Sequence, residues 1–169
     1  MDSVANDADD VDSVANDADE LAGIVDLFGA LTPGELEQAI EELAFKRGQE
    51  VDAESVTDAI EDAVAAYALV RYDDGNPLLA PGPVAFPTLP ANAEDLPHIL
   101  DIPTRDVDRE AAGRAVAERL RTDAARAVDA GDEGTIHRLL DVTYDVEVWS
   151  GAVAVDDVRD RLDDALDAE

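Results

Sequence analysis

The chain has 169 residues, of which 42 are acidic and 12 are basic, so its formal net charge is -30 at pH 7. A surface this negative repels the phosphates of nucleic acids and of anionic lipids unless a local basic patch overrides the repulsion. The length allows one ordinary domain or two very small ones, and the absence of cysteine excludes disulfide bonds and thiolate metal sites.

The 12 basic residues are eleven arginines and a single lysine, Lys46. A composition so rich in acid and so poor in lysine resembles that of proteins from salt-in halophilic archaea. In about 1 M salt the Debye length falls to about 3 Å, which screens the mutual repulsion of the carboxylates. We therefore expect a protein that requires a high intracellular KCl concentration. Because the N-terminus is acidic and no run of 18 apolar residues occurs, we expect a cytoplasmic location and no membrane segment.

The N-terminal residues contain a direct repeat, in which DSVANDAD at residues 2–9 recurs unchanged at residues 12–19. Two copies of a polar decapeptide are too few for a solenoid. The repeat also lacks the turn glycine and the alternating ligands of a calcium-binding loop. We therefore predict a disordered acidic tail over residues 1–18.

Three helices are predicted after the tail. Asp19 is expected to cap a short helix that ends near Gly29. A capping box that begins at Thr32, with proline at the first helical position, starts a second helix that ends near Gly48. Apolar residues at helical spacing predict a third helix over residues 52–66.

After the third helix, the apolar period changes from that of a helix to that of a strand. Residues 67–80 predict a short β-hairpin with a turn around Gly75. Three helices followed by a hairpin resemble a winged helix-turn-helix domain, and we assign this winged-helix-like unit to residues 19–90. Four prolines make its last ten residues extended, and residues 91–104 are interpreted as a linker.

Residues 105–169 are predicted to form a helical unit. Asp106 or Asp108 is expected to cap a long helix that ends near Gly131. A second helix is expected over residues 132–144.

The rest of this unit is less regular. Residues 146–155, around Trp149, fit either a loop or a strand, and a final helix is expected over residues 156–166. The predicted fold class is therefore mainly α: a winged-helix-like three-helix unit with a short β-hairpin, followed by a C-terminal helical unit.

One stretch of the sequence also resembles a known family. Residues 21–48, LAGIVDLFGALTPGELEQAIEELAFKRG, are similar to a family of small acidic haloarchaeal proteins of uncharacterised function. This resemblance implies no activity.

The winged-helix resemblance implies that the helix over residues 52–66 occupies the recognition position, which normally enters the major groove of DNA. This helix contains no lysine or arginine, and its acidic residues are Asp52, Glu54, Asp58, Glu61 and Asp62. Such a charge repels phosphates rather than releasing their counterions. Lys46, Arg47 and Arg71 remain as candidate nucleic-acid contacts, and three dispersed cations are a weak footprint.

Five arginines occur over residues 109–126. Arg114 and Arg121 flank the predicted apolar stripe of the helix on one side, and Arg119 and Arg126 flank it on the other, where arginine suits pairing with carboxylates of neighbouring helices. Two DDxxD patterns at residues 156–160 and 163–167 resemble the magnesium motif of prenyl synthases. The 28 aspartates make chance matches frequent, so a solvated helix face is favoured. His98 and His137 have no ligand-spaced partner. We expect no metal, no cofactor and no catalytic residue.

These observations favour a non-enzymatic protein-interaction or regulatory module of a halophilic archaeon, which binds a protein partner or associates with itself. The candidate contact residues lie in the apolar surface and the proline segment: Trp149, Val153, Val155, Pro87 and Pro90. The alternative is a transcription-associated factor that binds DNA through the winged helix. A third hypothesis, an enzyme, requires a pocket with converging polar groups.

Overall fold

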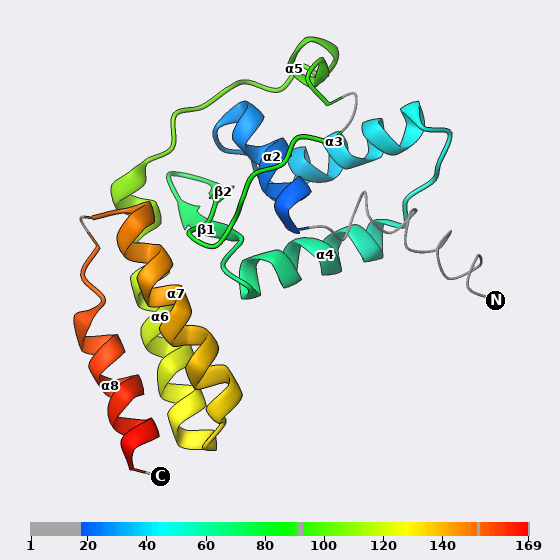
Figure 1. The fold of residues 1–169 in the computed structure, drawn as a ribbon. Coiled ribbons are helices and arrows are strands. Elements are labelled where there is room, and N and C mark those ends of the chain that lie inside the picture. The colour runs from blue at the N-terminus through cyan, green and yellow to red at the C-terminus, as the bar shows by residue number, and fades with distance from the viewer. Residues whose placement is uncertain (1–17, 91–92, 152, 169) are drawn as a thin grey trace, which may run out of the picture. The chain divides into compact units, whose positions relative to one another are not determined.

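The computed structural model describes residues 18–90, 93–151 and 153–168 (Figure 1). The described chain is mainly helical and has the predicted order of three helices, a short antiparallel hairpin and further helices. It divides into two compact units, Met1–Val107 and Asp108–Glu169, which we call the N-terminal and C-terminal units. The predicted disordered tail lies outside the described residues except for Ala18, which begins the first helix.

The N-terminal unit begins with the three predicted helices, α2 (Ala18–Phe28), α3 (Pro33–Lys46) and α4 (Ala53–Ala65). Each of them packs against the other two and buries an apolar stripe in one shared core. Asp19 is not the N-cap of α2, because it lies within the first turn. Its carboxylate instead accepts a hydrogen bond from the Phe86 N–H at 3.1 Å.

The capping box at the start of α3 is formed as predicted. The Thr32 N–H donates to Glu35 Oε1 at 3.0 Å, and the Glu35 N–H donates to Thr32 Oγ1 at 3.1 Å. Pro33 occupies the first helical turn, where its missing N–H costs no hydrogen bond. These local contacts set the entry of the chain into α3 and hold the Glu35 carboxylate at the N-terminus of that helix.

The hairpin consists of β1 (Leu69–Asp73) and β2 (Pro77–Pro81), paired antiparallel so that Tyr72 lies opposite Leu78. Leu31, between α2 and α3, pairs with Leu79 on the other edge of β2. The Leu31 N–H donates to the Leu79 carbonyl at 3.0 Å, and the Leu79 N–H donates back at 2.7 Å. This third extended segment was not predicted, because a single paired residue leaves no periodic signal.

In the predicted linker of residues 91–104, the described residues 93–104 pack onto the N-terminal unit. They contain the short helix α5 (Leu96–Ile99), and the side chains of Leu96, Leu100 and Ile102 are buried in the core of the N-terminal unit. Prolines and charged residues interrupt the apolar residues of this segment, so they show no helix or strand periodicity. Burial of the apolar side chains nevertheless favours packing of the segment onto the unit. The boundary between the units therefore lies after Val107 rather than at residue 104.

The C-terminal unit consists of α6 (Arg109–Ala130), α7 (Glu133–Trp149) and α8 (Asp156–Asp167), each of which packs against the other two (Figure 1). Asp108 caps α6 as predicted, because its carboxylate accepts the Ala111 N–H at 3.0 Å. Gly131 ends α6 in a left-handed conformation, with φ 64°. The predicted apolar stripe of α6 is buried.

Helix α7 is longer than predicted. It continues beyond residue 144 to Trp149, so residues 146–149 are helical, and the described residues among 150–155 lie outside helices and strands. The buried residues Leu139, Val142 and Val146 continue one helical stripe at intervals of three and four. The prediction of a loop or a strand for the start of this segment was therefore wrong, because packing against α6 and α8 outweighs the weak strand preference of its apolar residues.

Arg159 joins α8 to α7. Its side chain is mostly buried, and its Nη2 lies 2.8 Å from Glu147 Oε1. Its Nε donates to Thr143 Oγ1 at 3.1 Å, and its guanidinium lies 4.1 Å from the centre of the Tyr144 ring. A buried guanidinium with these three partners orients α8 on α7.

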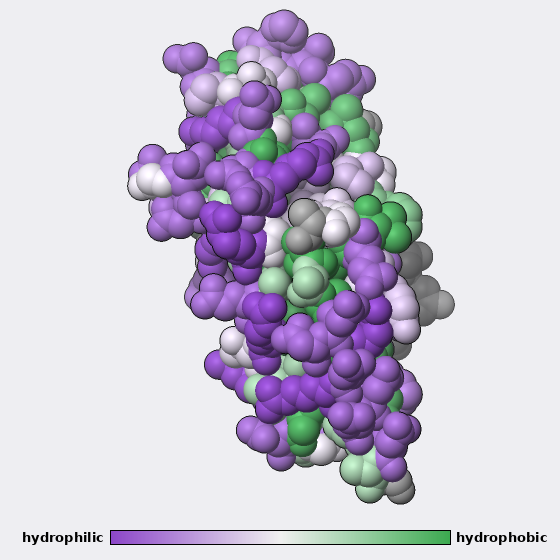
Figure 2. Space-filling view, turned by 90° about the vertical axis from the view of Figure 1, so that its left-hand side faces the viewer, coloured by the Kyte–Doolittle hydropathy of each residue, from purple (hydrophilic) through white to green (hydrophobic). Residues whose placement is uncertain are grey.

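The surface is polar, as the composition implies. On the face drawn in Figure 2, hydrophilic residues predominate, and hydrophobic residues show as smaller areas between them. Among the described helices, none is long and apolar enough to cross a membrane.

Candidate functional site

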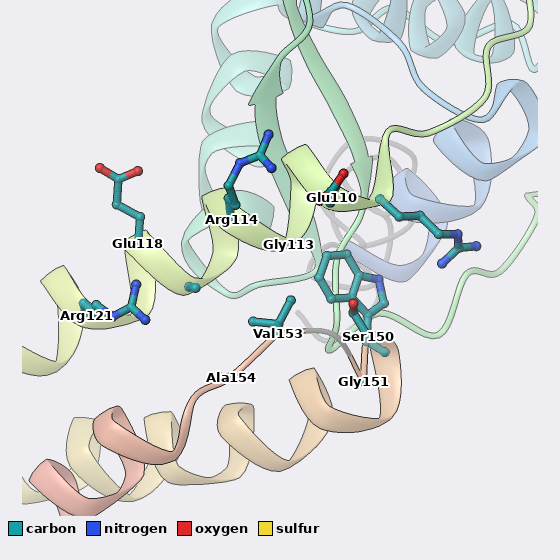
Figure 3. Close-up of a pocket in the computed structure, with 12 residues that line it drawn as sticks. Glu110, Gly113, Arg114, Glu118, Arg121, Ser150, Gly151, Val153 and Ala154 are labelled. Carbon is teal, nitrogen blue, oxygen red and sulfur yellow. The ribbon is translucent and has the colours of Figure 1, made fainter.

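A groove of about 860 Å³ lies in the C-terminal unit, between α6 and the loop that follows α7 (Figure 3). Its volume falls within the range of about 300–1,000 Å³ that is typical of ligand pockets. The residues that line it come from the first half of α6 and from the end of α7 with its following loop. This groove is the candidate functional site.

The floor of the groove consists of small residues on α6. Gly113 and Ala117 lie one turn apart, and the loop approaches them so closely that a Cβ atom at Gly113 would lie 2.6 Å from Val153 Cγ2. Figure 3 shows the Val153 side chain extending from the loop toward α6. Trp149, the last residue of α7, supplies an aromatic wall that is only partly exposed. The floor and walls are therefore apolar.

The rim of the groove is charged. Five charged residues of α6 line it: Arg109, Glu110, Arg114, Glu118 and Arg121. The last four share one face of the helix, and Arg109 lies in its first turn. Three arginines against two glutamates give these residues a net charge of +1, which Asp157 offsets where it pairs with Arg121. The rim is therefore close to neutral in a chain that carries -30.

The arginines of the rim differ in their partners. Arg121 Nε lies 3.3 Å from Asp157 Oδ2 on α8, and both side chains are largely exposed. Within the described ranges, the guanidinium groups of Arg109 and Arg114 form no hydrogen bond or ion pair with another residue. The predicted pairing with a neighbouring helix is thus confirmed for Arg121, and Arg119 pairs within α6, with Asp123. Two guanidinium groups of the rim remain available to a ligand.

The predicted contact residues are divided by the structure. Trp149 and Val153 both line the groove. Val155 is 1% exposed, because it packs in the core of its unit, so the prediction that it contacts a partner is wrong. In the N-terminal unit Pro87 is exposed but Pro90 is buried, so Pro90 is wrong for the same reason.

The candidate nucleic-acid contacts do not form a basic face on α4. Lys46 ends α3, Arg47 is its C-cap, and Arg71 lies on β1. Arg71 Nη2 is 2.7 Å from Glu61 Oε1 on α4, so an acidic residue of α4 already pairs with this cation. The exposed side of α4 carries the predicted acidic residues.

No group of three or more His, Asp or Glu side chains in the described part of the chain is arranged to hold a metal ion. In the first DDxxD pattern, Asp156 lies 3.7 Å from Arg159, and Asp157 pairs with Arg121. His98 and His137 are both exposed. Two of the three aspartates of this pattern are therefore engaged with arginines of the same unit.

An ion pair that no sequence pattern predicted joins α3 to the segment before the end of the N-terminal unit. Arg105 Nη1 lies 2.6 Å from Glu35 Oε1, and Arg105 Nη2 lies 3.1 Å from Glu35 Oε2. Arg105 Nη1 also donates to the Ala30 carbonyl at 3.1 Å. Hydrogen bonds from Arg105 hold the pKa of the Glu35 carboxyl below its ordinary value, although burial acts in the opposite direction. No sequence signal connects these residues, which lie 70 positions apart.

This lowered pKa predicts an acid-dependent loss of stability. Because the pKa of Glu35 is lower in the folded than in the unfolded state, its contribution is fully present above the ordinary glutamate pKa of about 4.3. It is lost as the pH falls through the folded pKa. We expect the native protein to unfold at a higher denaturant concentration than Glu35→Gln at pH 6, with a smaller difference at pH 3. Denaturant titrations at constant KCl measure this, and a pH-independent difference would contradict it.

A model of a family of unknown function, DUF7109, matches residues 19–167 of the chain. The match therefore extends through both units, including the groove. No curated protein and no solved structure matches the chain.

Proposed function

Since the chain belongs to this family of unknown function, we propose its function from its own geometry: it is a non-enzymatic interaction module that binds a segment of a partner protein. The groove beside α6 in the C-terminal unit receives this segment. The observation that carries the proposal is a groove with an apolar floor, an aromatic wall and a charged rim.

This arrangement is typical of protein interfaces, which have an apolar core and a polar rim. Tryptophan and arginine are the residues that most often dominate binding energy at such interfaces. Trp149 and Arg114 both line the groove, and Val153, which packs on Gly113, adds an apolar surface beside them. The groove therefore offers both an anchoring site and polar contacts.

The side chains that line the groove suit binding better than catalysis. Its lining residues include no histidine and no lysine, and Ser150 has no hydrogen bond to a side-chain base in the described part of the chain. A nucleophile and a base within hydrogen-bond reach are what acyl or phosphoryl transfer by the protein's own side chains requires. The composition of the lining thus supports a non-enzymatic role.

For the N-terminal unit, the winged-helix-like arrangement is part of the proposal. The pairing of Leu31 with Leu79 supports it, because it adds a short strand between the first and second helices. The acidic exposed face of α4 and the Arg71–Glu61 pair favour protein contacts over DNA binding. We place the protein in a cytoplasm with molar KCl, where its charge is screened.

The test is a photocrosslinking amino acid at Gly151, which lines the groove and where a Cβ atom meets no other atom within 4 Å. The matched control is the same amino acid at the exposed Gly134, on α7 outside the groove lining. In the cells that produce the protein, we expect Gly151 to crosslink to a defined protein that Gly134 does not reach.

The crosslinked protein is then purified and its affinity is measured by calorimetry in 2 M KCl. We expect Gly151→Trp, which adds a large side chain to the lining of the groove, to abolish binding and Gly134→Trp to leave it unchanged. Equal crosslinking from both positions, or equal affinity of both tryptophan variants, would contradict the proposed function. Crosslinks to nucleic acid from a probe near Arg71 would favour the DNA-binding alternative.

A further inference from the structure

We propose that the groove beside α6 recognises an acidic peptide segment, in which an apolar side chain is flanked by carboxylates. This inference rests on the proposed function and names the chemistry of the partner. The apolar side chain lies against Val153 and Trp149, and the carboxylates pair with the arginines of the rim.

Charge complementarity is the first argument for an acidic partner. The rim carries three arginines and two glutamates, in a chain with 42 acidic and 12 basic residues. Arg109 and Arg114 have no partner among the residues that the structure describes, and Arg121 shares only an exposed contact with Asp157. Arginine binds carboxylates through two parallel hydrogen bonds, so these side chains suit an acidic ligand better than a neutral one.

The distance between two arginines of the rim predicts the spacing of the acidic residues in the partner peptide. Arg114 and Arg121 are seven residues apart on one helix, which corresponds to about 10.5 Å along its axis. In a polyproline II segment, which has three residues per turn, residues three positions apart lie on the same side and span about 9 Å. A segment in this conformation with two acidic residues at this spacing can therefore meet both arginines, with an apolar residue between them.

Glu118 disfavours a partner that carries an acidic residue between the two that meet the arginines. It lies on the rim between Arg114 and Arg121 (Figure 3). A carboxylate of the partner beside Glu118 would be repelled, whereas an apolar or neutral side chain would not. The rim therefore favours two separated acidic residues over an unbroken acidic run.

A high salt concentration screens the repulsion between this acidic protein and an acidic peptide. At about 0.1 M ionic strength the Debye length is about 10 Å, so the charge of -30 repels an acidic peptide before contact. At about 1 M it is about 3 Å, which removes this repulsion but leaves direct hydrogen-bonded pairs less affected. The binding test is accordingly made in molar KCl.

The experiment selects binders for the immobilised full chain from a display library of random 12-residue peptides in 1 M KCl. We expect enriched peptides to contain an apolar residue between two acidic residues. An enriched peptide is then synthesised with a fluorophore, and its affinity is measured by anisotropy. Arg114→Glu should weaken binding by about tenfold or more, because it replaces a charged hydrogen bond by repulsion.

The matched control is Arg126→Glu, which makes the same charge change at an exposed position of α6 outside the groove lining. It should change the affinity less than twofold. Changing the acidic residues of the peptide to their amides should abolish the difference between the two variants. Circular dichroism verifies that both variants are folded.

The outcomes separate this inference from the proposed function. Peptides that lose binding in Gly151→Trp but are not acidic, or that bind Arg114→Glu and Arg126→Glu equally, overturn the acidic ligand and keep the groove as a docking site. Peptides that bind Gly151→Trp normally contradict both. Failure to enrich any peptide, when a control target recovers its own binder, also overturns the inference.

Discussion

Replacing Gly29 with alanine is expected to lower the free energy of unfolding of the N-terminal unit by about 3 kcal/mol or more. Gly29 follows α2 with φ 89°, in the left-handed region, and a Cβ atom there would overlap the carbonyl oxygen of Arg105. The neighbouring backbone cannot easily withdraw, because the Arg105 N–H donates to the Phe28 carbonyl at 2.8 Å. Backbone strain and overpacking therefore add at this position.

The control for Gly29→Ala is Gly48→Ala. Gly48 also has a left-handed backbone, with φ 69°, but a Cβ atom there meets no atom within 4 Å. It should cost only the backbone penalty of about 1 kcal/mol. Denaturant titrations in 2 M KCl, followed by circular dichroism and by hydrogen exchange of each unit, measure both costs. Equal costs would show that contact with Arg105 adds nothing to the requirement for glycine.

The second large effect is expected from the Glu35–Arg105 pair. A double-mutant cycle with Glu35→Gln and Arg105→Gln should give a coupling energy of about 2 kcal/mol, because both side chains are mostly buried and doubly hydrogen-bonded. Glutamine at position 35 retains an acceptor for the capping box, so the cycle isolates the ion pair.

The Glu61–Arg71 pair provides a matched cycle in the same unit. Its contact of 2.7 Å is close to the 2.6 Å of the Glu35–Arg105 pair, but its side chains are 56% and 40% exposed, against 20% and 28%. Solvent and salt screen the exposed pair, so its coupling should stay below about 1 kcal/mol. Both cycles are measured by denaturant unfolding in 2 M KCl. Similar coupling energies would mean that burial does not strengthen the Glu35–Arg105 pair.

Interactions between residues close in sequence were the ones that could be predicted. The capping box of Thr32 with Glu35 and the cap at Asp108 each span three residues, so the sequence contains both partners side by side. The same holds for the buried stripe of α6, which repeats every three or four residues. These signals predicted the helices and their order.

The errors arose where distant packing overrides local preference. The apolar residues from position 146 fitted either a loop or a strand, yet α7 continues to Trp149 because α6 and α8 cover that face. Leu96, Leu100 and Ile102 lie in a segment interpreted as a linker, and they are buried by helices far away in sequence. Val155 and Pro90 were predicted to contact a partner, and both are buried within their own units.

The sequence by itself determined the mainly helical composition, the order of helices and hairpin, and the strongly negative charge, because these depend on residue types and short spacings. It also showed that basic residues gather in the C-terminal unit. Only the tertiary structure decided that Arg109, Arg114 and Arg121 border an apolar groove with Trp149, and that Arg105 pairs with Glu35. Such sites join residues from separate elements, and the free energy of packing the core is what brings them together.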